Sequence, residues 1–160
     1  MDIKKHITSL GFVPKNGTNG IYHKTYVDYA IEIDFERQNI NYGNSIIAES
    51  RTTQNFSQPE NFVVLECVDR LLIKGYKPQN IVLEKTWPSG HGTSGRLDIC
   101  VNREDGTPYM LIECKTYGKE YNKESAKIHK DGGQLFTYFQ LSGGKADVIM
   151  LYASELKGDK

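Results

Sequence analysis

The sequence predicts an α/β domain, in which a central β-sheet of mixed strand direction has helices on both sides. Three observations support this class: an amphipathic helix pattern begins near residue 57, three strand-like runs follow it, and a further helix precedes a last apolar strand. We expect this core over residues 51–160 and a β-rich N-terminal extension packed on it over residues 1–50.

Composition and charge exclude several classes of protein. The 160 residues carry no net charge, whereas a freestanding, non-specific DNA-binding protein is usually basic. Three cysteines without a CxxC pair argue against a disulfide framework and a zinc ribbon. No stretch reads as a signal peptide or a membrane span, so we expect a cytoplasmic protein without a membrane partner.

The first 50 residues show turn and strand signals after a short helical start. Asn16-Gly17 and Asn19-Gly20 are turn signals, and Ile31, Ile33 and Phe35 alternate with charged residues. The pattern indicates half-exposed strands, and thus a small β-rich layer.

The first core helix is predicted in residues 57–78, "SQPENFVVLECVDRLLIKGYKP". Ser57 and Glu60 fit a capping box, and a proline is tolerated in the first turn. The apolar positions that form a broad helical stripe are 62, 64, 65, 68, 71 and 72. Gly75 and Pro78 end the helix.

The remaining core elements follow in order. "NIVLEKTW", "RLDICVN" and "PYMLIECKT" predict strands, and Asp105-Gly106 between the second and third predicts a hairpin. A polar, lysine-rich stretch comes next, and "GGQLFTYFQLS" predicts a second helix. "DVIMLYAS" is continuously apolar, which is typical of a strand buried on both faces.

Charged residues in two of these strands point to a site. Glu113 and Lys115 share one face of their strand, and the hairpin brings Asp98 close to them. Two converging carboxylates repel each other unless a proton or a cation lies between them. Carboxylate oxygens on a rigid sheet suit Mg²⁺, and a nearby ammonium can orient water and offset charge on a phosphate.

The segments "RLDICV" and "LIECK" resemble the PD-(D/E)xK nuclease superfamily, although Leu97 replaces the proline of that pattern. Gln134 and Tyr138 form a QxxxY pair on one helix face, as in the branch that includes Type I restriction motor subunits. "GGQLFTYFQ" is especially similar to the nuclease domain at the N-terminus of a Type I restriction enzyme R subunit. The resemblance covers about residues 57–153 and implies a restriction-endonuclease-like core.

The resemblance also implies an activity and its residues. It implies a type I site-specific deoxyribonuclease, a Mg²⁺-dependent endonuclease on double-stranded DNA in which Mn²⁺ can replace Mg²⁺. By the family pattern Asp98 and Glu113 bind the metal, and Lys115 positions or activates the attacking water. Glu66 is an accessory metal ligand, while Gln134 and Tyr138 orient the site and meet the DNA backbone.

The implied partners are the specificity and methyltransferase subunits of a restriction-modification system. ATP is expected to act only through a motor domain outside this chain. Two alternatives remain open: a stand-alone DNA repair or defence nuclease, and a catalytically silent DNA-binding or assembly module of the same fold.

Simpler interpretations exist for individual residues. The three charged strand residues could form an ordinary surface ion pair, and Glu66 could be a solvated helix residue. Glu84 could also face the site, but a charge at a strand edge is the preferred interpretation. The lysines of the polar stretch could meet phosphates, but Glu120 and Glu124 among them favour an exposed mixed-charge face. These lysines are Lys119, Lys123, Lys127 and Lys130.

Overall fold

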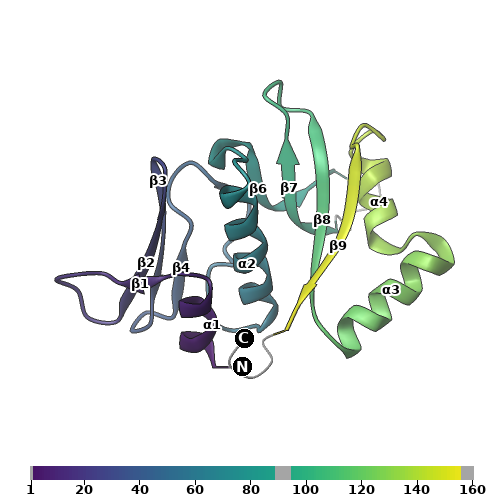
Figure 1. The fold of residues 1–160 in the computed structure, drawn as a ribbon. Coiled ribbons are helices and arrows are strands. Elements are labelled where there is room, and N and C mark those ends of the chain that lie inside the picture. The colour runs from purple at the N-terminus through teal and green to yellow at the C-terminus, as the bar shows by residue number, and fades with distance from the viewer. Residues whose placement is uncertain (1, 89–94, 156–160) are drawn as a thin grey trace.

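The computed structural model describes residues 2–88 and 95–155. It has an antiparallel sheet at the N-terminus and a mixed five-stranded sheet after it, with helices around the second sheet (Figure 1). The predicted α/β class, with mixed strand direction and a β-rich N-terminal layer, is therefore confirmed. None of the helices in these two ranges is long and apolar enough to cross a membrane.

The N-terminal layer begins with a short helix whose first turn is capped by Asp2, which accepts a hydrogen bond from the amide of Lys5. The alternation predicted around Ile31 and Ile33 is confirmed, because both side chains are fully buried. The elements are α1 (Ile3–Ser9), β1 (Val13–Pro14), β2 (Ile21–Tyr26), β3 (Tyr29–Asp34) and β4 (Asn39–Asn41), and the four strands pair antiparallel in this order.

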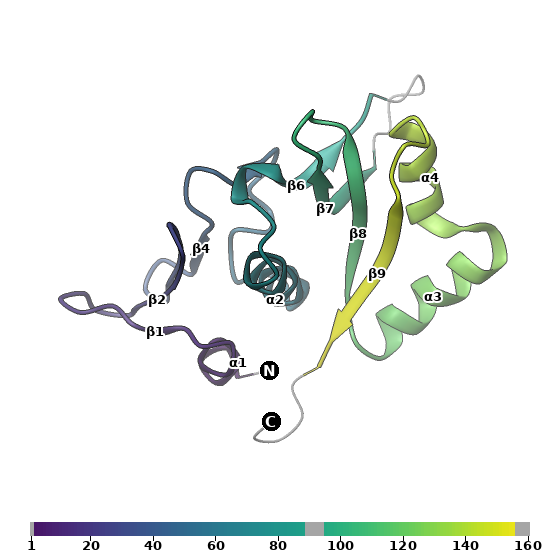
Figure 2. The same cartoon turned by 45° about the horizontal axis from the view of Figure 1, so that its top comes forward.

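Helix α2 (Glu60–Ile73) lies between the two sheets and contributes to the core on both sides (Figure 2). The predicted helix and its end at Gly75, whose φ is +88°, are confirmed. The capping box is wrong: Pro59 occupies the cap position in a helical conformation, and no side chain caps the first turn. Ser57 hydrogen-bonds Asn55 instead, which leaves Glu60 free to face another element.

The five-stranded sheet has the order β5-β6-β7-β8-β9. β7 and β8 form the predicted antiparallel hairpin, while β5 pairs parallel to β6 and β9 parallel to β8. A short 3-10 turn, η1, precedes β6. The bounds are β5 (Ile47–Ala48), η1 (Pro78–Asn80), β6 (Ile81–Thr86), β7 (Arg96–Asn102), β8 (Pro108–Thr116) and β9 (Val148–Ser154).

Two helices cover the face of this sheet that lies opposite α2 (Figure 2). The predicted second helix is α4 (Gly133–Leu141), and the polar stretch before it forms another helix, α3 (Lys119–Asp131). Gly132 joins them in the left-handed region, with φ of +84°. Leu135 and Tyr138 of α4 pack on the second, smaller core of the sheet.

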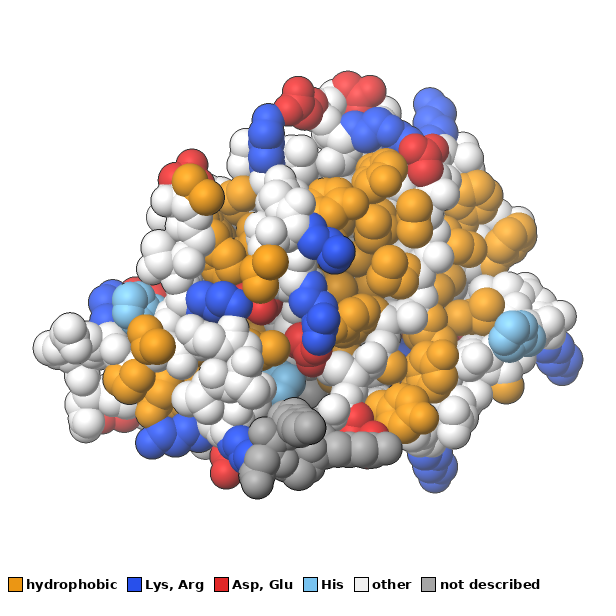
Figure 3. Space-filling view, viewed as in Figure 1, with side chains coloured by type: hydrophobic (Ala, Val, Ile, Leu, Met, Phe, Trp, Pro, Cys, Tyr) orange, Lys and Arg blue, Asp and Glu red, His pale blue; other side chains and the backbone are white. Residues whose placement is uncertain are grey.

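The expectation that the last strand is buried on both faces is wrong. β9 is an edge strand, and most of its side chains are only half-buried, with Ile149 exposed. Figure 3 shows hydrophobic side chains at the surface over β8 and β9. A continuous apolar run therefore does not require a central position, since an edge strand that α2 and α4 cover only in part carries the same pattern.

Candidate functional site

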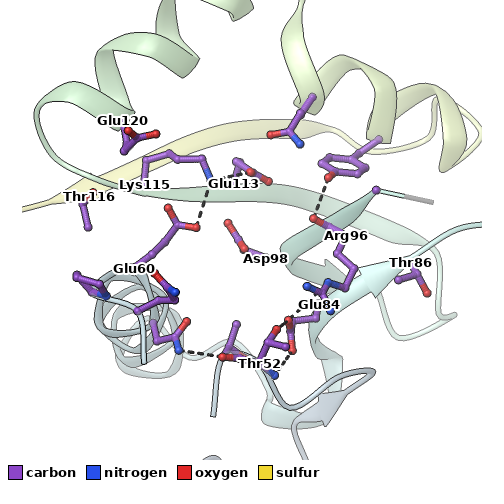
Figure 4. Close-up of a pocket in the computed structure, with 17 residues that line it drawn as sticks. Thr52, Glu60, Glu84, Thr86, Arg96, Asp98, Glu113, Lys115, Thr116 and Glu120 are labelled. Carbon is purple, nitrogen blue, oxygen red and sulfur yellow. Dashed lines mark hydrogen bonds and ion pairs between the residues drawn. The ribbon is translucent and has the colours of Figure 1, made fainter. Parts of the chain in front are cut away.

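A cavity of about 1050 Å³ lies where the N-terminal end of α2 faces the sheet. Its walls come from the loop before α2 and the first turn of α2, from β6, β7 and β8, and from α3 and α4 (Figure 4). Five of the six predicted site residues line it: Asp98, Glu113, Lys115, Gln134 and Tyr138. The sequence thus predicted residues that the fold brings together from three elements.

Asp98 lies at an interruption of the sheet. The pairing of β7 with β8 ends at Ile99 and Ile112, one residue short of Asp98. Beyond that pair the Asp98 side chain replaces the backbone as hydrogen-bond acceptor, because its Oδ2 accepts a hydrogen bond of 2.7 Å from the backbone amide of Cys114. The carboxylate is therefore fixed to the neighbouring strand beside Glu113.

Glu113 and Lys115 form an ion pair within β8, with 2.8 Å between Glu113 Oε1 and Lys115 Nζ. The same ammonium also lies 3.3 Å from Glu60 Oε1 and donates to the Cys114 carbonyl at 2.9 Å. Glu113 is only 4% exposed, and its Oε2 is buried without a hydrogen-bond partner in the described part of the chain. An orphaned carboxylate oxygen of this kind is costly unless a cation or a ligand satisfies it.

The close packing of Asp98, Glu113 and Lys115 shifts the pKa of each of them. Burial, followed by repulsion from Glu113, raises the pKa of Asp98 to about 8. Burial also raises the pKa of Glu113, while Lys115 opposes that rise. Burial disfavours the ammonium of Lys115, but Glu113, Asp98 and Glu60 outweigh it and raise its pKa, so Lys115 stays charged. The two acids, by contrast, compete for protons or for a cation.

Glu66 is the predicted site residue that does not line the cavity. It is buried on another face of α2, where it pairs with Arg70 at 2.7 Å and accepts a hydrogen bond of 3.1 Å from Tyr152. Burial favours its neutral form, yet hydrogen bonds from Ser154, Arg70 and Tyr152 lower its pKa. Glu66 is thus a satisfied carboxylate apart from Asp98 and Glu113.

The acid that α2 brings to the cavity is Glu60, in its first turn. Six residues separate it from Glu66, which in an α-helix turns the side chain by about 240° to a different face. Sequence reasoning took Glu60 as a capping residue. The signal that could have identified it is its position at the helix end, which Lys115 at the end of β8 can reach.

Glu84 faces the site, which is the less favoured of the two interpretations of its sequence position: it lies in β6, lines the cavity and is only 3% exposed. The pairing of β6 with β7 passes from Leu83–Ile99 to Lys85–Leu97, and Glu84 between them has φ of +54°. This conformation is rare for a residue with a side chain and occurs mostly where surrounding contacts enforce it. It turns Glu84 into the cavity, on the other side of Asp98 from Glu113 (Figure 4).

Glu84 also ties the loop before α2 to the sheet. Its Oε2 accepts a hydrogen bond of 3.1 Å from the backbone amide of Thr52, and its Oε1 accepts one from the Thr52 hydroxyl. Arg96 Nε lies 3.7 Å from the same carboxylate. Asn61 of α2 donates to the Thr52 carbonyl at 2.8 Å, so one wall of the cavity is held from two elements.

The two residues of the QxxxY pair, Gln134 and Tyr138, make different contacts. Both residues line the cavity, and the Tyr138 hydroxyl donates a hydrogen bond of 2.8 Å to the Arg96 carbonyl at the start of β7. Burial, followed by repulsion from Glu113 and Asp98, raises the pKa of Tyr138, which therefore stays protonated as a donor. A Cβ atom on Gly95 would lie 2.8 Å from the Tyr138 ring, so the ring needs glycine there.

The expected mixed-charge face of α3 is confirmed for Glu120, which is exposed like the four lysines, and is wrong for Glu124. Glu124 is 3% exposed, pairs with Lys127 at 3.0 Å, and accepts a hydrogen bond of 3.4 Å from the Gln134 amide. Glu120 lines the cavity (Figure 4). Glu124 therefore turns toward the neighbouring helix, whereas Glu120 borders the cavity and stays exposed, as do all four lysines.

The donor set of the cavity fits magnesium better than zinc. Within residues 2–88 and 95–155, no group of three His, Cys, Asp or Glu side chains could hold a metal by itself. Mg²⁺ is often bound by one or two carboxylates, with water and substrate phosphate as its other ligands, and Asp98 with the orphaned oxygen of Glu113 can supply those two. Zn²⁺ would need more protein ligands.

The charge of the cavity also calls for a cation. Its acidic lining residues are Glu60, Glu84, Asp98, Glu113 and Glu120, and its basic ones are Arg96 and Lys115. An excess of carboxylates over cations repels phosphate, so the cavity can receive a phosphodiester only after part of this charge is neutralised.

Comparison with known proteins identifies a family for this chain. The model of a family described as Type I restriction enzyme R protein N terminus (HSDR_N) matches residues 59–146, more than half of the chain. The match runs from the start of α2 to just before β9 and includes every predicted site residue. No curated protein matches the sequence significantly.

Proposed function

Because the chain belongs to the family of Type I restriction enzyme R protein N-terminal domains, we propose that it is a Mg²⁺-dependent endonuclease domain acting on double-stranded DNA. The observation that carries the proposal is the meeting of Asp98, Glu113 and Lys115 in one cavity. A core of the restriction-endonuclease type is part of the proposal. The reaction is hydrolysis of a phosphodiester by in-line attack of water on phosphorus.

Asp98 and Glu113 hold the metal in this proposal. The bond from the Cys114 amide fixes Asp98, and the ion pair with Lys115 fixes one oxygen of Glu113 and leaves the other available. A bound Mg²⁺ offsets the negative charge of the phosphate and makes water more acidic. Glu84 and Glu60 shape this arrangement from the adjoining strand and helix.

Lys115 supplies the cationic group of the reaction. Its ammonium stays charged among three carboxylates and lies beside Glu113, where it can hold the attacking water and offset charge on the phosphate. Gln134 offers a neutral donor and acceptor to the DNA backbone. Tyr138 positions the start of β7, which carries Arg96 and Asp98.

The family supports a restriction-modification complex as the setting. We assign target choice to the specificity and methyltransferase subunits and ATP-driven translocation to a motor domain outside this chain. The zero net charge agrees with this assignment, since a module that partners deliver to DNA does not need the overall basic charge of a freestanding DNA-binding protein. A stand-alone nuclease would be expected to carry more positive charge.

The test is calorimetric titration of Mn²⁺ into the wild type and the Asp98→Asn and Glu113→Gln variants. Glu104→Gln is a matched control, because it removes one carboxylate from an exposed pair with Lys77 far from the cavity. We expect metal binding by the wild type and the control, and at least a tenfold loss of affinity in the two site variants. Equal affinity in all four folded proteins would overturn the proposed site.

Nicking of a supercoiled plasmid in Mg²⁺ then tests catalysis. Lys115→Met should retain divalent binding and lose at least about 100-fold in cleavage rate, because it removes a group that acts on the reacting water and phosphate. Intact metal binding without any cleavage by the wild type, even with specificity and motor subunits present, would instead indicate a silent module.

A further inference from the structure

We propose that the lysine row of α3, formed by Lys119, Lys123, Lys127 and Lys130, binds the phosphate backbone of duplex DNA next to the cavity. This inference rests on the proposed function, and it assigns to that site the surface by which the substrate is held. At 100° per residue the four side chains lie within about 80° of one another on the helix. They form one continuous basic stripe.

The stripe borders the cavity. On the same helix Glu120 lines the cavity and Glu124 is buried toward α4, and the lysines occupy the sector immediately beside these two acids. Lys119 to Lys130 span about 16 Å along the axis of α3, which equals the axial length of four or five base pairs of duplex DNA at about 3.4 Å each. A backbone laid along the stripe thus passes the mouth of the acidic cavity.

Internal stabilisation of the protein does not account for the stripe. Of the four lysines only Lys127 forms an ion pair within the described ranges, with Glu124. Lys130 lies in the last turn, where the helix dipole favours a cation, but Lys119 occupies the first turn, where the dipole disfavours one. The cost at that end is explained if Lys119 meets an external anion.

The chain as a whole has reason to need such a surface. Its net charge is zero and its cavity carries an excess of carboxylates, so neither attracts a polyanion. Two different groups then bind the substrate and the cation. The exposed lysines bind the DNA backbone, and the carboxylates of the cavity bind the cation that makes one phosphate reactive.

The test is the salt dependence of duplex binding. Fluorescence anisotropy of a short labelled duplex would be measured over a range of KCl, with Ca²⁺ in place of Mg²⁺ and the DNA checked for intactness. The test variant is Lys119→Gln with Lys123→Gln and Lys130→Gln, which spares the Lys127 ion pair. The slope of log affinity against log salt is negative, and each lost phosphate contact reduces its magnitude by about 0.9. We therefore expect the test variant to have a slope whose magnitude is smaller by about two to three than that of the wild type.

A matched control keeps the total charge equal. Lys74→Gln with Lys77→Gln and Lys145→Gln removes the same charge from exposed positions beyond the C-terminal end of α2 and before β9. We expect this control to bind like the wild type. Equal slopes for all three proteins, or equal losses in both triple variants, would overturn the proposal, as would a wild type without salt-dependent binding.

The duplex-binding test and the cleavage test can fail independently of each other. A smaller slope in the test variant together with no cleavage by any protein would support the stripe and count against the nuclease. Cleavage by the wild type with unchanged binding by the test variant would support the nuclease and assign the lysines to a partner other than DNA.

Discussion

The backbone amide of Cys114 donates a hydrogen bond of 2.7 Å to the carboxylate of Asp98. A side chain thereby joins β7 to β8 at the point where their backbone pairing has ended. This bond holds the Asp98 carboxylate beside Glu113 of the next strand, where burial, followed by repulsion from Glu113, raises the pKa of Asp98.

Asp98 makes folding stability depend on pH. Its pKa is about 8 in the folded protein and has an ordinary value of 3.8, so between these values the folded state binds more protons than the unfolded chain. Stability from this group is complete below pH 4 and is lost as pH rises to 8. Urea unfolding in EDTA from pH 5 to 8 should show a decline on the order of a few kcal/mol in the wild type.

The Asp98→Asn variant is the control for that decline, because asparagine cannot ionise. Its unfolding free energy should change less over the same range, and equal pH dependence in the two proteins would contradict the assignment.

The Glu66→Gln variant tests whether Glu66 is a structural acid or a metal ligand. Glu66→Gln weakens the contacts to Arg70 and Tyr152 and should lower the unfolding free energy by about 1–2 kcal/mol. Mn²⁺ affinity should stay within twofold of the wild type, in contrast to Glu113→Gln. A tenfold loss of Mn²⁺ affinity in folded Glu66→Gln would show that Glu66 is a metal ligand after all.

Glu84 should matter for stability because it closes the cavity wall. Glu84→Ala removes the acceptor of two hydrogen bonds from Thr52 and leaves those donors without it. We expect a loss of about 1–3 kcal/mol in chemical denaturation. Glu84→Gln keeps an acceptor for Thr52 and should lose less; similar losses in both variants would show that the charge near Arg96 dominates instead.

Tyr138 should act through position and not through its proton. Tyr138→Phe loses the 2.8 Å hydrogen bond to the Arg96 carbonyl and should cost about 1 kcal/mol in thermal or urea unfolding. Tyr121→Phe on α3 is a suitable control, since it keeps the ring that stacks on Tyr117 and its hydroxyl forms no hydrogen bond within the described residues. If the hydroxyl acts as a catalytic acid, cleavage would instead fall at least about 100-fold without a matching loss of stability.

Much of the fold was predictable because local patterns determine it. The apolar stripe of α2, the turn at Asp105-Gly106 and the alternation around Ile31 each depend on neighbours in sequence. The meeting of Asp98 with Glu113 and Lys115 was predictable for the same reason, since one hairpin joins them. The edge position of β9 was not, because pairing order in a sheet depends on long-range contacts.

The sequence by itself determined the α/β class, the paired strands and the carboxylate–lysine centre. Only the tertiary structure decided which other acids join that centre: Glu60, Glu84 and Glu120 line the cavity, while Glu66 is buried on another face of α2 and Glu124 is buried against α4. The physical reason is that a helix or an irregular strand can direct a carboxylate to any side. The packing of α2, α3 and β6 then fixes the direction.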